Sequence, residues 1–173
     1  RREQHSPARS RARPVLSGGD RGRRLVVMRH AKSAWGDEDM DDHERPLNER
    51  GRGDAPRIAA RLAELGWSPD LVWSSDAVRT RETAERMLPA FDAAPEVFFD
   101  PSLSLAGFGA LQAAAARWPD RSRTVLVPGH NPGWEQTARL LAGHPVRMTT
   151  ADAVPFQRAE DAADWAAALP DAR

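Results

Sequence analysis

Two arginines and two histidines in this chain closely follow short apolar runs that end abruptly in polar residues. They are Arg29, His30, Arg79 and His130. Guanidinium groups bind phosphate oxygens through paired N–H donors. A neutral imidazole placed among them can attack phosphorus, provided that its second ring nitrogen donates to a backbone carbonyl and fixes the tautomer. Neighbouring arginines favour the neutral imidazole. The residue types therefore predict a phosphate site with a histidine nucleophile.

The elements that must position these residues are short strands. Candidate strands, rich in β-branched or aromatic residues and too short for helices, lie at 25–28, 70–75, 97–99 and 124–128, with a further candidate at 153–157. Stretches with helical spacing of apolar residues separate the first four. This alternation predicts an α/β fold, a three-layer α/β/α sandwich with a mostly parallel central sheet. Strand carboxyl ends and helix amino ends then meet at one edge, where ligands bind.

The first helical stretch begins after Asn48, a candidate N-cap, and ends near Gly66. Pro56 lies inside it and leaves two alternatives open. Either one helix is kinked at the proline, or Asp54 caps a second helix with Pro56 in its first turn.

Length and composition restrict the protein class. The 173 residues predict one domain over 24–173, after a disordered basic arm over 1–23 that also has the arginine content of a transit peptide. The balance of 25 basic and 25 acidic side chains gives no reason to expect nucleic acid or membrane partners. The absence of cysteine excludes thiol chemistry and Cys-ligated zinc. We expect a cytoplasmic protein that needs no cofactor.

An acidic loop follows the first strand, and it offers a competing interpretation as a metal site. Its acids are Asp37, Glu38, Asp39, Asp41, Asp42 and Glu44. The spacing and glycine of a calcium loop are missing, so a solvated loop and no metal are predicted. Signatures of a phosphate-binding Gly-rich loop or a serine nucleophile elbow are also missing.

Four motifs in order resemble the histidine phosphatase superfamily. They are Arg29-His30-Ala31, Arg45-Pro46-Leu47-Asn48-Glu49-Arg50-Gly51, Ser75-Asp76-Ala77-Val78-Arg79-Thr80-Arg81-Glu82-Thr83 and Gly129-His130-Asn131-Pro132. The resemblance runs from about Leu25 to Phe156 and implies a phosphoglycerate mutase-like fold. The small size and the Arg-His-Ala-Lys-Ser form of the first motif look most like SixA-type phosphohistidine phosphatases.

The resemblance also implies roles for individual residues. His30 becomes the nucleophile that is transiently phosphorylated, and Arg29, Arg79 and His130 bind the phosphoryl oxygens and stabilise the transition state. Ser33 stands where a hydroxyl can add a hydrogen bond to phosphate. Metal is not part of this chemistry.

Two departures from the family pattern bear on the substrate. Ala31 replaces the usual glycine, which requires a negative φ at that residue. The glutamate that serves larger, mutase-like members as general acid has no secure match, and Asp100 is the nearest candidate. A missing acid is less harmful when a P–N bond is cleaved, which favours a phosphohistidine protein as substrate. A phosphatase or mutase for a small phosphorylated metabolite is the alternative. A non-catalytic phosphate-binding module is disfavoured because both histidines are present.

Overall fold

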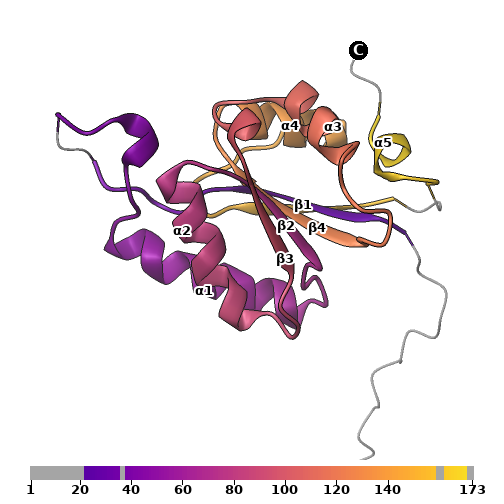
Figure 1. Ribbon diagram of the computed structural model, residues 1–173, viewed down its shortest axis with the longest axis horizontal. Helices are drawn as coiled ribbons and strands as arrows, with labels where there is room; N and C mark the ends of the chain where they lie inside the picture. The colour runs from indigo at the N-terminus through magenta and orange to yellow at the C-terminus, as the bar shows by residue number, and fades with distance from the viewer. Residues whose placement is uncertain (1–21, 36–37, 159–161, 171–173) are drawn as a thin grey trace, which may run out of the picture.

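The computed structural model describes residues 22–35, 38–158 and 162–170. They form three layers, a five-stranded sheet between two groups of helices (Figure 1). The predicted sandwich architecture is thus confirmed. The arm expected over 1–23 lies, up to residue 21, outside the described residues.

The central sheet has the order β3-β2-β4-β1-β5. Its strands are β1 (Arg24–Arg29), β2 (Leu71–Ser75), β3 (Glu96–Asp100), β4 (Thr124–Gly129) and β5 (Ala153–Gln157). The first four are parallel, and β5 runs antiparallel to β1 at the edge. In the pairing of β1 with β4, Arg29 lies opposite Gly129. This register makes neighbours of the residues that follow, His30 and His130.

The helices cover both faces of the sheet. They are α1 (Glu49–Glu64), α2 (Val78–Met87), α3 (Phe108–Ala115), α4 (Gly133–Ala142) and α5 (Trp165–Ala168). Three short 3₁₀ turns are η1 (Asp42–Glu44), η2 (Leu88–Ala90) and η3 (Pro101–Leu103). Figure 1 shows α1 and α2 below the sheet and α3, α4 and α5 above it. Strands β1, β2 and β4 are therefore buried on both sides, as their apolar sequences require, whereas the edge strand β3 stays partly exposed.

Alternate residues of β1 supply two separate cores. Leu25 and Val27 belong to the cluster beneath α3, α4 and α5, whereas Val26 and Met28 belong to the cluster with α1 and α2. This follows from the two-residue repeat of a strand. Each fully buried side chain of this size contributes about 1.5–3 kcal/mol to folding. The strand that leads to His30 is therefore held rigidly from both faces.

Helix α1 begins as predicted, because the Asn48 side chain accepts a hydrogen bond from the Gly51 N–H at 2.9 Å. The helix is continuous through Pro56, which decides between the two alternatives. Pro56 and Arg52, whose carbonyl loses its partner, are both exposed. Water can therefore satisfy the carbonyl group that the proline leaves free.

The predicted boundary of the arm needs a correction at Arg23. Its side chain is buried and donates to the backbone carbonyls of residues 120, 122, 162 and 163. Four charge-assisted bonds of this kind fix a guanidinium group inside the fold. Arg23 therefore belongs to the domain. The sequence pattern missed this because an arginine beside other arginines looks like part of a solvated arm.

Candidate active site

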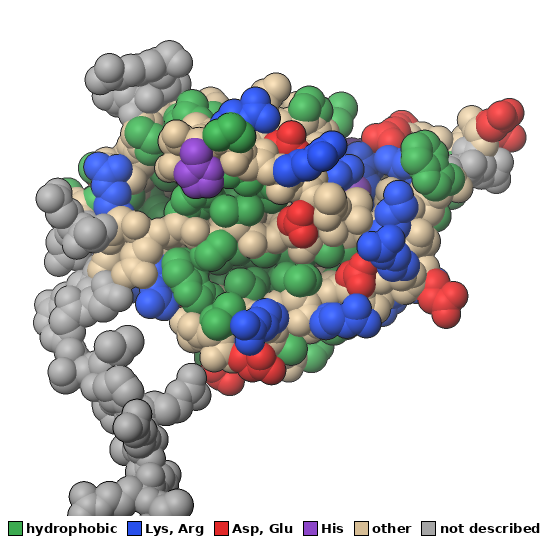
Figure 2. All heavy atoms as spheres, turned by 180° about the vertical axis from the view of Figure 1, so that it is seen from behind, with side chains coloured by type: hydrophobic (Ala, Val, Ile, Leu, Met, Phe, Trp, Pro, Cys, Tyr) green, Lys and Arg blue, Asp and Glu red, His purple; other side chains and the backbone are tan. Residues whose placement is uncertain are grey.

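One cavity of about 270 Å³ contains all four residues that the motifs single out, Arg29, His30, Arg79 and His130. It lies at the carboxyl ends of β1, β2 and β4. Figure 2, which views the molecule from behind, shows Lys and Arg side chains gathered toward the end that carries the loop after β1. The predicted convergence at one sheet edge is therefore what the fold produces.

His30 is held in one tautomer at the end of β1. Its backbone N–H donates to the Gly129 carbonyl, and its Nδ1 lies 2.7 Å from the Ala31 carbonyl oxygen. A carbonyl only accepts, so Nδ1 carries the proton and Nε2 keeps its lone pair. The ring is 7% exposed. The loop geometry therefore leaves the Nε2 lone pair of His30 unprotonated.

Helix α2 fixes the backbone beside His30. The Ala31 N–H donates to the Thr83 hydroxyl at 3.0 Å, and that hydroxyl donates to the Arg79 carbonyl at 2.7 Å. Among the described residues other than glycine, only Leu105 and Ala151 have positive φ. Ala31 thus keeps the negative φ that its side chain demands, and the departure from glycine is harmless.

His130 faces His30 across the site, with 5.4 Å between the ring centroids. Its Nε2 is 2.8 Å from the Ser75 hydroxyl at the end of β2. Its Nδ1 is buried without a hydrogen-bond partner in the described structure. Ser75 was placed at this strand end by the sequence, but its role as the partner of His130 became visible only in the fold.

The arginines direct donors to the same space. Arg29 donates to the Met148 carbonyl at 3.1 Å, and Arg79 donates to the Asp42 carbonyl at 2.7 Å. Arg45, for which no role was predicted from the sequence, also lines the cavity. The Nε atoms of all three arginines are buried without a partner in the described structure. Buried donors of this kind are costly unless a ligand satisfies them.

The missed Arg45 had a signal in the sequence. It opens the second of the four motifs, but no apolar strand precedes it, so the pattern of strand ends does not indicate it. A β-bridge between Ser33 and Leu47 and a bond from the Asn48 N–H to the Lys32 carbonyl bring its segment beside the first motif.

Burial and positive charge keep both histidines neutral. Burial is the main cause that lowers the pKa of His30 from 6.5 to about 4, and Arg79, Arg29 and Arg45 lower it further against the Ala31 hydrogen bond. Burial, Arg79 and His30 lower the pKa of His130 to about 3. At neutral pH an unprotonated Nε2 of His30 is therefore available for attack.

The rim of the cavity is partly apolar. Trp35 is 83% exposed and Leu105 is 75% exposed, and both line the opening. Lys32 Nζ and the Arg45 guanidinium each lie 5.7 Å from the Trp35 ring centre. Ser33, the other predicted phosphate ligand, lines the same cavity and is buried. The exposed indole and the exposed leucine give the opening of the cavity an apolar contact area.

Asp100, the candidate general acid, lies elsewhere. Its side chain accepts hydrogen bonds from the Trp73 indole N–H at 2.8 Å, from Ser102 at 2.6 Å and from Arg117 at 3.2 Å. These bonds lower the pKa of its carboxyl group, although burial alone would raise it. It is not among the residues that line the cavity. A carboxylate held in this way is a structural anchor for the end of β3, so we assign it no proton transfer.

Two further questions concern metal and membrane. Within 22–35, 38–158 and 162–170, no three His, Asp or Glu side chains are grouped so as to hold a metal ion. Asp37 of the acidic loop lies outside these ranges. No helix in the same ranges is both long and apolar enough to cross a membrane.

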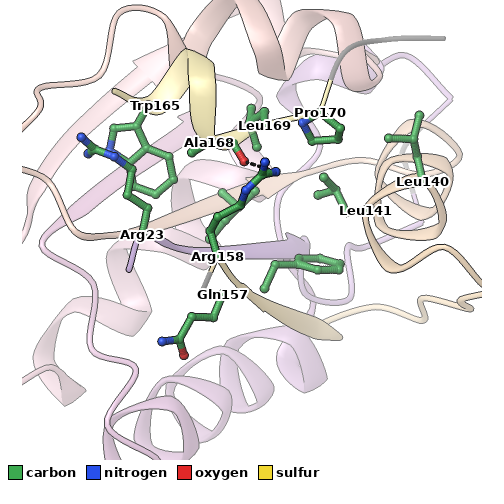
Figure 3. Close-up of a pocket in the computed structure, with 11 residues that line it drawn as sticks. Arg23, Leu140, Leu141, Gln157, Arg158, Trp165, Ala168, Leu169 and Pro170 are labelled. Carbon is green, nitrogen blue, oxygen red and sulfur yellow. Dashed lines mark hydrogen bonds between the residues drawn. The ribbon is translucent and has the colours of Figure 1, made fainter. Parts of the chain in front are cut away.

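A second cavity, of about 290 Å³, lies near the start of β1 and between α4, α5 and β5. Figure 3 shows Leu140, Leu141 and Leu169 around it, with Arg158 donating to the Ala168 carbonyl at 3.1 Å. Its lining is mainly apolar and offers no histidine or carboxylate. Unlike the first cavity, it therefore holds no candidate nucleophile of the predicted kind.

Comparison with known proteins agrees with this geometry. The model of the histidine phosphatase superfamily (branch 1) matches residues 25–139, and the chain belongs to this superfamily. Within it the fold is SixA-like. A protein from Agrobacterium tumefaciens assigned as the phosphohistidine phosphatase SixA is 28% identical, with a TM-score of 0.71 over 79% of this chain and 92% of that chain.

Curated relatives extend the comparison to photosynthetic organisms. An uncharacterised chloroplastic protein of Arabidopsis thaliana is 41% identical over 145 residues, which is 78% of this chain and 66% of that protein. The chain thus spans just under two thirds of the plant relative. An uncharacterised protein of Picosynechococcus is 32% identical over 73% of this chain and 80% of its own length.

Proposed function

We propose that the protein is a phosphatase that transfers a phosphoryl group to His30 Nε2 and then to water. The observation that carries this proposal is the single tautomer of His30, fixed by the Ala31 carbonyl and surrounded by three arginines. A site that only binds phosphate does not need a histidine fixed in one tautomer. A neutral imidazole with a free Nε2 suits attack on phosphorus.

The proposed reaction has two steps. In the first, His30 Nε2 forms a bond to phosphorus while the bond from phosphorus to the leaving group breaks. In the second, a water oxygen forms a bond to the same phosphorus while the bond from phosphorus to Nε2 breaks; both protons of the water leave with the phosphate, and His30 returns to its neutral state. Arg29, Arg79 and Arg45 offer N–H donors to the phosphoryl oxygens through both steps, and His130 lies opposite the attacking ring. Charge that develops on these oxygens is thereby stabilised.

As the substrate we propose a protein phosphohistidine. When its second ring nitrogen carries a proton, an imidazole leaves as a neutral group and needs no strong acid. This fits a site from which Asp100 is withdrawn. The exposed Trp35 and Leu105 at the opening suit a protein surface or a planar leaving group. The Agrobacterium protein, which shares the fold, is assigned as a phosphohistidine phosphatase. We also propose that the protein needs no metal ion for this reaction and that it acts in the cytoplasm.

A labelling experiment tests the mechanism. Brief incubation with ³²P-labelled phosphohistidine protein should leave acid-labile, base-stable phosphate on the wild-type chain. The His30→Ala variant should lose both label and turnover, whereas the exposed His144→Ala variant should keep both. Turnover of His30→Ala at the wild-type rate would refute the covalent mechanism.

A substrate panel tests the substrate class. Phosphohistidine protein, phosphoserine peptide and small phosphate esters should be compared without added metal and with a chelator. We expect the phosphohistidine protein to have the highest kcat/KM. A preference for a small ester would support the metabolite phosphatase instead. Loss of activity in chelator, restored by a divalent ion, would return attention to the acidic loop.

A further inference from the structure

The anion subsite is bridged by a carboxylate of the chain itself, that of Asp42. One carboxylate oxygen lies 3.0 Å from Arg79, and the other lies 3.0 Å from Arg45. The Asp42 backbone carbonyl accepts a further bond from Arg79 at 2.7 Å. Asp42 lines the cavity and is the one carboxylate to do so among the described residues.

The three side chains differ sharply in burial. The Arg79 side chain is 4% exposed and that of Arg45 is 20% exposed, whereas that of Asp42 is 61% exposed. Arg79 is thus fixed in the protein, and its negative partner can turn into solvent at low cost. In the free protein the carboxylate offsets the charge of guanidinium groups that would otherwise repel one another beside His30.

A phosphoryl group requires the same donors. Two of its oxygens can bridge two guanidinium groups much as the two carboxylate oxygens do. The two arginines that Asp42 contacts, Arg79 and Arg45, are among the three that lower the pKa of His30, so their charges act on its ring. A carboxylate and a phosphoryl group placed between the same two guanidinium groups stand close together, and their negative charges repel.

We propose that Asp42 is a positioning residue whose carboxylate holds the anion subsite in the free protein and is displaced by the phosphoryl group of the substrate. It keeps Arg79 and Arg45 directed into the cavity until substrate arrives. The turn that carries it, η1, is anchored separately, because His43 contacts Asp76 at 3.3 Å and Ser104 at 3.4 Å. Displacement therefore needs only rotation of the Asp42 side chain. The inference depends on the proposed function only in taking the displacing anion as a phosphate.

Binding of inorganic phosphate tests this without any turnover. The dissociation constant should be measured by calorimetry for the wild type and for Asp42→Asn. The control is Asp41→Asn, which removes the same charge from the same loop; Asp41 accepts a bond from the His43 N–H and does not line the cavity. Thermal unfolding of each protein should be followed with and without phosphate.

We expect Asp42→Asn to bind phosphate at least about fivefold more tightly than wild type. Asp41→Asn should bind it less than about twofold more tightly, because Asp41 carries the same charge but does not contact the arginines of the cavity. Asp42→Asn should unfold at a lower temperature without phosphate and recover with it. With p-nitrophenyl phosphate, KM should fall more than kcat changes. Equal or weaker phosphate binding by Asp42→Asn would overturn the proposal, as would equal tightening in both variants. Phosphate binding without any phosphatase activity would refute the proposed function and leave this inference standing.

Discussion

The lowered pKa of His30 predicts how stability depends on pH. The unfolded chain has a histidine pKa near 6.5, and the folded value is about 4. Between these values the unfolded state binds a proton that the folded state does not, so folding stability falls as pH decreases through this interval. Above pH 6.5 both states are neutral, and the group makes no contribution. At about 1.4 kcal/mol per pKa unit, the full loss for His30 is about 3 kcal/mol.

The perturbation that isolates this contribution is His30→Asn. The asparagine amide can still donate to the Ala31 carbonyl, but it does not titrate. Urea unfolding of wild type and variant should be measured at about pH 7.5 and about pH 4.5. We expect the wild-type protein to lose more stability between these conditions than the variant does, by about 2–3 kcal/mol. The absolute stability of the variant does not enter this comparison.

A matched control separates this effect from general acid titration. His144→Asn makes the same substitution at an exposed position outside the cavity, and so it controls for the exchange of histidine for asparagine. His130 titrates in the same window, because burial also lowers its pKa, so the wild-type loss exceeds the contribution of His30 alone. Parallel pH profiles of wild type and His30→Asn would refute the reasoning, since His30 would then bind its proton equally well in the folded protein.

Three further predictions concern activity. Arg79→Ala should lower kcat/KM at least about 100-fold, because it removes donors from the phosphoryl oxygens. Arg81→Ala should have little effect, since Arg81 donates to the Asp76 carbonyl and packs on Phe99 outside the cavity. Equal effects of the two substitutions would refute the role of Arg79 in binding the phosphoryl group. Trp35→Ala should lower kcat/KM for phosphohistidine protein about tenfold but change kcat/KM for acetyl phosphate less than about twofold, because the indole contacts only the leaving group. Equal losses with the two substrates would contradict this role of Trp35. Lys32→Arg should lower kcat/KM although the charge is kept, because a planar guanidinium does not fit the place of a compact ammonium; a silent result would leave Lys32 with generic charge at most.

Much of the fold could be predicted because short stretches of the sequence determine its strands and helices. Valine-rich runs such as 25–28 indicate buried strands, and Asn48 indicates a helix start. The alternation of strands and helices then requires a sheet covered on both faces. Since parallel strands end at one edge, Arg29, His30, Arg79 and His130 had to converge there.

The sequence could not decide which charged groups meet. Asp42 and Arg79 are 37 positions apart and are joined only by the path of the loop before α1. From the sequence, Asp42 was one acid among six, and Arg45 was one arginine among many. Which of them reaches the cavity depends on a loop whose course no periodicity describes.

Asp100 is a residue that the sequence suggested for the site but that the fold places outside the cavity. Its position at the end of β3 agrees with the predicted strand end, but strand ends alone do not fix the environment of a carboxylate. The indole of Trp73 and the guanidinium of Arg117 come from β2 and from beyond α3, and they take up its oxygens. The sequence by itself determined the strands of the sheet, the edge at which they end and the four residues at that edge, Arg29, His30, Arg79 and His130. Tertiary structure decided the partner of each charge, because desolvation and hydrogen bonding act between groups that are distant along the chain.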